Sequence, residues 1–146
     1  MCPHVEQYQI YSFDIQNVHM DEITIKFYDD TLFYFECKQN VYLYGALNAK
    51  YGEAKREVKT KYITCQNNYS GAQINHIENE TFHKWRWDKQ IKCYDDLQNF
   101  YDEDCKEILS YDFYLINLKY SQKEENCQEG AIKKETEDYK NKLNKF

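Results

Sequence analysis

The fold class is decided by residues 81–93, TFHKWRWDKQIKC, which show the clearest alternation of apolar and polar side chains in the sequence. A period of two is typical of a strand that buries one face, because successive side chains point to opposite sides of a sheet. The dry face would carry His83, Trp85, Trp87, Ile91 and Cys93, and the wet face Lys84, Arg86, Asp88 and Lys92. Lys89 interrupts the dry face, so we expect a bend or bulge there, or a lysine whose stem follows the interior to the rim.

Seven further segments are rich in aromatic and β-branched residues and have the length of strands. They are Gln7–Ile15, Ile23–Tyr28, Leu32–Cys37, Val41–Leu47, Glu57–Cys65, Ala72–Ile77 and Asp112–Tyr120. From about residue 131 the period becomes helical, with apolar residues at 132, 139, 143 and 146 on one side. The sequence therefore predicts one domain over residues 1–146. It would be a β barrel or sandwich with strands over about 7–120 and a helix over about 131–146 that packs on the sheet.

Aromatic residues take the place of the usual turn residues. The 146 residues include 4 Gly and 1 Pro, but 15 Tyr, 8 Phe and 2 Trp. The shortage of glycine argues against phosphate-binding loops, and the net charge of −6 argues against nucleic-acid binding. Strict alternation in residues 83–87 would also put Trp85 and Trp87 on one face and the neighbouring basic residues on the other. Rings and charges could then not hold the same nucleotide, so we expect no nucleic-acid partner.

Six cysteines are dispersed singly, at positions 2, 37, 65, 93, 105 and 127. This spacing does not suit zinc, and it fits either a secreted framework of three disulfides or buried reduced thiols. Asn68 and Asn79 begin glycosylation sequons, which are compatible with secretion. The first residues lack the features of a signal peptide, so the chain is either intracellular or a mature secreted form behind an added Met. The longest run without strongly polar residues, Val41–Leu47, is too short to span a membrane.

No motif predicts catalysis or a cofactor. The HExxH and GxSxG patterns are absent, and His76-Ile77-Glu78 has no accompanying PCxxC. The acidic stretch from Asp95 to Asp104 lacks the glycine of a calcium-binding EF-hand, and we expect it to be a solvated loop. The protein is therefore expected not to be an enzyme and to hold no metal or cofactor.

Three segments near the end of the chain follow one another in a recognisable order: Tyr101–Cys105 (YDEDC), Tyr111–Tyr114 (YDFY) and Glu125–Cys127 (ENC). With the helix after them, they resemble the C-terminal third of the tick salivary lipocalins, a family that includes histamine-binding proteins. Residues 33–37, FYFEC, also resemble the family's early aromatic strand. The resemblance implies a secreted salivary protein with a lipocalin-like antiparallel barrel.

The same resemblance implies a disulfide between Cys105 and Cys127. In the family the early cysteine pairs with one beyond the helix, which has no counterpart here, so Cys2 is the available partner for Cys37. Cys65 and Cys93 would then form the third bridge. Since six cysteines allow 15 pairings, this set is a hypothesis.

A barrel of this size can enclose one small ligand. The resemblance places Asp112 and Tyr114 where the family presents a carboxylate and a ring to a bound amine. Aromatic walls could come from Tyr42, Tyr44, Trp85 and Trp87. We expect a monomer that sequesters a biogenic amine or a lipid mediator.

Three alternatives stay open. Asp112 could lie on an edge strand in water and bind nothing. The barrel could be filled solid, with exposed tyrosines that bind a host or other partner protein. The chain could also be an intracellular subunit of a larger complex, with its cysteines reduced.

Overall fold

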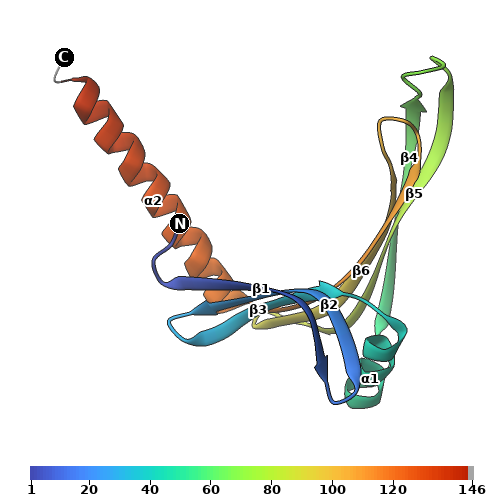
Figure 1. Ribbon diagram of the computed structural model, residues 1–146, viewed down its shortest axis with the longest axis horizontal. Coiled ribbons are helices and arrows are strands. Elements are labelled where there is room, and N and C mark those ends of the chain that lie inside the picture. Colours follow the sequence, from blue (N-terminus) through green and yellow to red (C-terminus); the bar gives the residue numbers. More distant parts are fainter. Residues whose placement is uncertain (145–146) are drawn as a thin grey trace.

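The computed structural model describes residues 1–144 and shows one seven-stranded antiparallel sheet accompanied by two helices (Figure 1). The strand order is β1-β2-β3-β7-β6-β5-β4. The strands are β1 (Val5–Ile15), β2 (Val18–Tyr28), β3 (Thr31–Lys38), β4 (Lys55–Gln66), β5 (Gln73–Trp87), β6 (Ile91–Tyr101) and β7 (Glu107–Asn117), and the helices are α1 (Val41–Tyr51) and α2 (Leu118–Leu143). The prediction of a mainly β protein with a C-terminal helix is confirmed.

The sheet is open, with β1 and β4 as its edge strands. All neighbouring pairs are antiparallel, so β1 and β4 run in the same direction. After β3 the chain passes through α1 to the far edge of the sheet, where β4 begins. In Figure 1 the two ends of the sheet diverge, so the predicted closed barrel is not formed.

Residues Val41–Leu47, predicted as a strand, form the first two turns of α1. The Asn40 side chain caps this helix by accepting hydrogen bonds from the backbone N–H groups of Tyr42 and Leu43, at 3.0 and 2.9 Å. Gly52 ends it with a φ of 85°, which favours glycine. The strand prediction was wrong because a seven-residue apolar run also fits a helix whose residues at i and i+4, here Leu43 and Leu47, are buried.

The decisive stretch 81–93 belongs to two strands. β5 ends at Trp87, the chain reverses over residues 88–90, and β6 begins at Ile91. The Asp88 side chain holds this turn by accepting hydrogen bonds from the backbone N–H groups of Gln90 and Ile91. Lys89, where we expected a bend, lies in this reversal. The predicted strand Ala72–Ile77 forms the other end of β5.

A β-bulge at Trp85 changes which side chains share a face. Lys84 pairs with Tyr94, but Arg86 pairs with Cys93, so the register shifts between them. Trp85 therefore packs towards α1, whereas Trp87 pairs with Lys92 on the opposite face. The prediction that both tryptophans share one face was wrong, because one extra residue in a strand restarts the alternation.

The hydrophobic core lies between α1 and one face of the sheet. Its buried residues are Met20, Ile23, Cys37, Leu43, Leu47, Cys93 and Phe113. Because α1 is the only element of the described chain that contributes helical residues to this cluster, the core covers only the middle of the sheet.

A buried carboxylate lies beside this core. Asp95 has no exposed surface and takes part in three hydrogen bonds: from Gln39 Nε2 (2.8 Å), with His83 Nδ1 (2.6 Å) and from the Tyr111 hydroxyl (3.0 Å). Gln39 directly precedes the cap residue of α1, so this network fixes the point where the helix leaves the sheet. The prediction that residues 95–104 form a solvated loop was wrong, since most of them belong to β6.

Helix α2 begins at Leu118, 13 residues earlier than predicted. Only its first part contacts the sheet: Glu124 forms a salt bridge with Lys26 at 3.1 Å, and Cys127 forms a disulfide with Cys2. Farther along, the side chains expected to pack on the sheet are exposed, Ile132 and Tyr139 at 64% each and Leu143 at 52%. Packing of residues 131–144 on the sheet is thus not found, and 145–146 lie outside the described residues.

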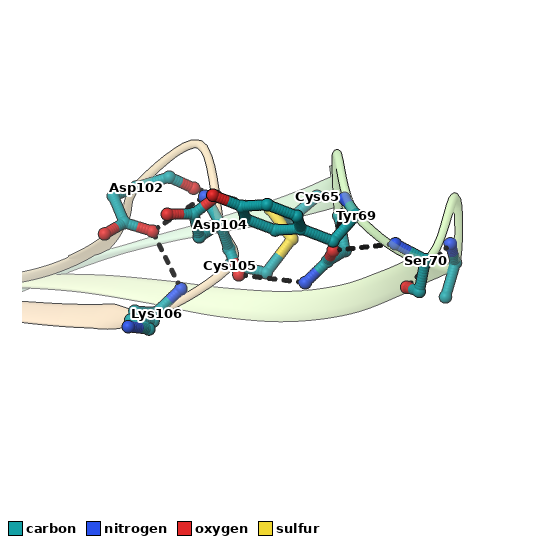
Figure 2. Close-up of a disulfide and its surroundings, with 9 residues drawn as sticks. Cys65, Tyr69, Ser70, Asp102, Asp104, Cys105 and Lys106 are labelled. Atoms are coloured by element: carbon teal, nitrogen blue, oxygen red, sulfur yellow. Dashed lines mark hydrogen bonds between the residues drawn. A yellow bond between two sulfur atoms is a disulfide. The ribbon is translucent and has the colours of Figure 1, made fainter.

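The disulfides are Cys2–Cys127 and Cys65–Cys105, while Cys37 and Cys93 are free and buried. All three predicted pairs are therefore wrong. The resemblance could not supply the strand pairing, which places Cys65 and Cys93 beside opposite ends of β5 and brings the β4–β5 turn beside the β6–β7 turn. Figure 2 shows Cys65–Cys105 joining these turns, reinforced by a 3.2 Å hydrogen bond from Asn67 Nδ2 to the Asp104 carbonyl.

Candidate functional site

Within residues 1–144, no helix covers the middle of one face of the sheet. We call the side opposite α1 the open face; in Figure 1 α1 lies on one side of the sheet and α2 rises on the other. The strand register places two rows of side chains across it. The first row is Lys38, Asp112, Asp96 and Phe82, and the second is Glu36, Tyr114, Tyr94 and Lys84. The open face thus combines carboxylates, rings and ammonium groups in fixed order.

Two tyrosines stack at the centre of the second row. The rings of Tyr94 and Tyr114 have centroids 5.2 Å apart and an interplanar angle of 22°. Burial raises the pKa of both hydroxyls, so both remain protonated at neutral pH. Beside them, the Tyr34 hydroxyl donates a 2.7 Å hydrogen bond to Glu36.

The first row ends in a groove of about 530 Å³ between β1, β2, β3 and β7. Its lining residues are Gln9, Ile10, Tyr11, Glu22, Ile23, Thr24, Glu36, Lys38 and Asp112. Three of them carry carboxylates and one carries an ammonium group. We call this the acidic groove.

The ammonium group in the groove comes from Lys38. Its Nζ lies 3.0 Å from Oδ1 of Asp112 and 3.6 Å from Oε2 of Glu22. The hydrogen bond to Asp112 raises the pKa of Lys38, so the group stays charged. Asp112 is positioned from its own strand by Ser110, whose hydroxyl donates a 2.8 Å hydrogen bond to Oδ2.

A second pair of carboxylates lies next along the sheet. Gln98 Nε2 donates hydrogen bonds to both Asp96 and Glu80, and the Oδ1 atom of Asp96 is buried without a hydrogen-bond partner among the described residues. Burial, followed by the neighbouring Glu80, raises the pKa of Asp96 to about 6. The carboxylates of the open face thus continue from β3 and β7 onto β6 and β5.

The structure brings together three of the six predicted ligand residues. Asp112, Tyr114 and Trp87 lie on the open face, with Trp87 4.9 Å from Tyr94. The other three, Tyr42, Tyr44 and Trp85, do not lie there. Tyr42 projects from α1 and is 73% exposed, while Tyr44 and Trp85 pack edge to face at 5.4 Å on the α1 side.

Sequence reasoning missed Glu22, Glu36, Lys38, Tyr94 and Asp96. A signal existed for Glu36, because it stands two residues after Tyr34 in the predicted strand 32–37 and must share its face. Tyr94 and Asp96 were missed because the predicted strand ends at Cys93 and residues 95–104 are predicted to be a solvated loop.

Both predicted glycosylation sites are exposed to solvent. Asn68 lies in the β4–β5 turn beside the Cys65–Cys105 disulfide, at the place where Figure 2 shows Tyr69 and Ser70. Asn79 lies within β5, where its side chain accepts a 3.0 Å hydrogen bond from Thr60. A glycan on Asn68, in a turn, would disturb the backbone less than a glycan on Asn79, within a strand.

Within residues 1–144, no three His, Cys, Asp or Glu side chains are grouped closely enough to hold a metal ion. Neither helix has the length and apolar character that crossing a membrane requires.

Comparison of the chain with protein-family models, with curated proteins and with solved structures finds no match. The resemblance to the tick salivary lipocalins therefore rests on the short residue patterns alone, and the open face has to be interpreted from its own chemistry.

Proposed function

We propose that the protein is a non-enzymatic binding protein that holds a small organic cation, such as a biogenic amine, in the acidic groove. The observation that carries this proposal is the position of Lys38 between Asp112 and Glu22. A primary ammonium group already occupies these carboxylates, so the groove has the chemistry of an ammonium site with a side chain of the protein as its occupant.

The excess of carboxylates in the groove favours a ligand whose positive charge adds to that of Lys38. Glu22, Glu36 and Asp112 line the groove, whereas Lys38 is the single cation among its lining residues within 1–144. Partial burial strengthens the attraction, since the Asp112 side chain is 16% exposed. The volume of about 530 Å³ lies within the range of small-molecule sites, roughly 300–1,000 Å³.

Aromatic side chains supply the rest of such a site. Tyr114 follows Glu36 in the second row, and its stacked partner Tyr94 extends the ring surface. Tyr11 stands at the rim of the groove. Ring faces beside carboxylates attract alkylammonium groups, and a lining this polar favours an amine over a lipid mediator.

The two disulfides support a location in an oxidising compartment, as expected for a secreted protein. Cys2–Cys127 holds α2, and Cys65–Cys105 holds the β4–β5 and β6–β7 turns together, at places where other contacts are few. We accordingly place the proposed function outside the reducing cytosol.

Isothermal titration calorimetry with 2-phenylethylamine, histamine and 2-phenylethanol tests the proposal. The alcohol lacks the ammonium group and should not bind. Asp112→Asn should weaken amine binding by at least about tenfold, as the loss of a charge-assisted hydrogen bond predicts. Lys38→Met should strengthen it, because the ligand no longer competes with the internal ammonium group.

Asp30→Asn is the matched control, since Asp30 lies in the β2–β3 turn away from the groove. Equal affinity of wild type, Asp112→Asn and Asp30→Asn for the amines would refute the proposal, as would equal binding of the alcohol.

A second candidate, binding of a partner protein, is favoured by β1. This edge strand exposes Tyr8, Tyr11 and Phe13 at 50%, 86% and 55%. Exposed rings beside unpaired backbone groups are typical of strand-addition surfaces. Failure of all amines to bind a folded wild-type protein would favour this candidate over the acidic groove.

A further inference from the structure

We propose that the open face carries a second site of opposite charge, formed by Trp87, Lys84 and Lys92, which binds a planar ring carrying a phosphate, as in a nucleotide. This site lies on β5 and β6, away from the acidic groove on β1, β2, β3 and β7. It is independent of the amine proposal.

The bulge at Trp85 creates this site. Without it, Trp87 would face away from Lys84, and rings and charges would be separated. Because the register shifts at Trp85, Trp87 shares the open face with both lysines. The Nζ atoms of Lys84 and Lys92 each lie 4.2 Å from the centroid of the Trp87 ring.

The surroundings of Trp87 are basic in an otherwise acidic protein. Within the segments 55–61 and 84–92, the strand register places five lysines on the open face with one acidic residue, Glu57; the lysines are Lys55, Lys59, Lys61, Lys84 and Lys92. These segments are adjacent in the sheet, where Lys55 lies directly opposite Lys84. Like charges opposite each other destabilise a sheet; the salt bridge from Glu57 to Lys84 offsets part of this cost, and a bound anion would offset more of it.

One of the two lysines is free to take an anion. Lys84 forms a salt bridge with Glu57, whereas no carboxylate of the described residues lies within salt-bridge distance of Lys92. An anion beside Trp87 would therefore give Lys92 a partner and share Lys84 with Glu57. Phosphate suits this role, because it offers several acceptor oxygens to more than one ammonium group.

The indole supplies the surface for the planar ring. Trp87 is 44% exposed, and it is supported edge to face by Tyr94 at 4.9 Å and by Phe82 at 6.4 Å. The ammonium groups of Lys84 and Lys92 lie over the Trp87 ring, so a stacking base would displace one of them, and the displaced group would then be placed to neutralise the phosphate. A simple aliphatic anion would use the charges but leave the ring unused.

The test is quenching of tryptophan fluorescence at low salt by AMP, adenosine, inorganic phosphate, oligothymidylate and polyglutamate. We expect AMP to bind at least about tenfold more tightly than adenosine or phosphate alone, with an affinity that falls as salt is added. Adenosine or inorganic phosphate binding as tightly as AMP would overturn the combined site. Polyglutamate binding as tightly as oligothymidylate would show that the site recognises negative charge alone, and it would also overturn the proposal of a combined site.

Oligothymidylate distinguishes the source of the ligand. An affinity far above that of AMP would support the site and identify single-stranded nucleic acid as the occupant, and an affinity similar to that of AMP would support a free nucleotide.

Variants assign the binding to this cluster. Lys92→Gln should weaken AMP binding about tenfold, the size expected for a charge-assisted contact, and Lys92→Arg should restore it. The matched control is Lys89→Gln, which removes the same charge from the adjoining turn without touching the Trp87 ring. Equal losses in Lys89→Gln and Lys92→Gln would overturn the proposal, and circular dichroism checks that each variant is folded.

Binding measured by calorimetry in Trp87→Leu gives a second readout, since AMP should no longer bind. Unchanged AMP affinity in this variant would refute the site. Asp112→Asn should leave AMP binding intact and Lys92→Gln should leave amine binding intact, so failure of one proposal is distinguishable from failure of the other.

Discussion

His83 Nδ1 lies 2.6 Å from Oδ1 of Asp95, a carboxylate without any exposed surface. Together with Gln39 and Tyr111, His83 completes a network that joins β5, β6, β7 and the residue before the α1 cap. Removal of this carboxylate leaves three polar groups without their common partner.

Asp95→Ala should therefore lower the free energy of unfolding by about 3 kcal/mol or more. The side chains of Gln39, His83 and Tyr111 would each lose a hydrogen bond to Asp95 but still pay the cost of desolvation. Urea unfolding followed by circular dichroism measures the change. Asp138→Ala, at an exposed position of α2, is the control and should change little. Similar losses in the two variants would contradict the role given to Asp95.

Asp96 should make stability depend on pH in an unusual direction. Its pKa is raised to about 6, mainly by burial, whereas the unfolded value is about 3.9. The folded state thus holds the proton more tightly, so the contribution of Asp96 is fully present below about pH 4 and is lost as the pH rises through about 6. Asp96→Asn should be more stable than wild type near pH 7.5, and this advantage should vanish near pH 4.

Asp88 supplies a control of opposite sign. The hydrogen bond from Arg86 lowers the pKa of Asp88 to about 2, so its contribution is present above about pH 4 and is lost as the pH falls through 2. Asp88→Asn should therefore be less stable than wild type at neutral pH. A parallel pH dependence of the two variants in chemical denaturation would contradict both assignments.

Cys37 and Cys93 should be unreactive thiols in the native protein. Burial raises the pKa of Cys37 to about 12 and that of Cys93 to about 11, so little thiolate forms near neutral pH. Iodoacetamide should leave the native mass unchanged. In denaturant without reductant it should add two groups per chain, and after reduction six. Zero additions in denaturant would show a third disulfide instead.

The two disulfides should differ in their effect on stability. Cys2–Cys127 has a sequence separation of 125 residues and Cys65–Cys105 one of 40. In the chain-entropy description, replacing the first pair by serines should cost about 1 kcal/mol more than replacing the second. Denaturant titration of the two double variants measures the difference, and a larger loss for Cys65–Cys105 would argue against this description.

The sequence predicts the strands better than their arrangement. Alternation is a local property, so β1, β3 and β4 could be located from it, although Val41–Leu47 satisfied the strand pattern and still formed a helix once Asn40 capped it. The strand order depends on where the chain crosses after β3, and no local pattern contains that information. The disulfide pairing depends on the same crossing, so it could not be predicted from local patterns either.

The resemblance singled out Asp112 and Tyr114 for the candidate site, and unbroken alternation adds that the two share a face. Asp112 and Tyr114 lie on one face of β7, as two residues at i and i+2 must. Trp85 and Trp87 have the same spacing but lie on opposite faces, because the register shifts between Lys84 and Arg86, where Trp85 donates a hydrogen bond to Asn48 of α1. Such a bulge changes which side chains share a face, and it therefore changes which residues can bind one ligand together.

Helix α2 slows the rotational diffusion and the sedimentation of the whole molecule. Its last tie to the sheet is the Cys2–Cys127 bridge, and residues 128–143 extend beyond it for about 24 Å at the usual rise per residue (Figure 1). A rod fixed at one end to a sheet with diverging ends has a large frictional coefficient for its mass. The protein will tumble and sediment more slowly than a sphere of 17.8 kDa.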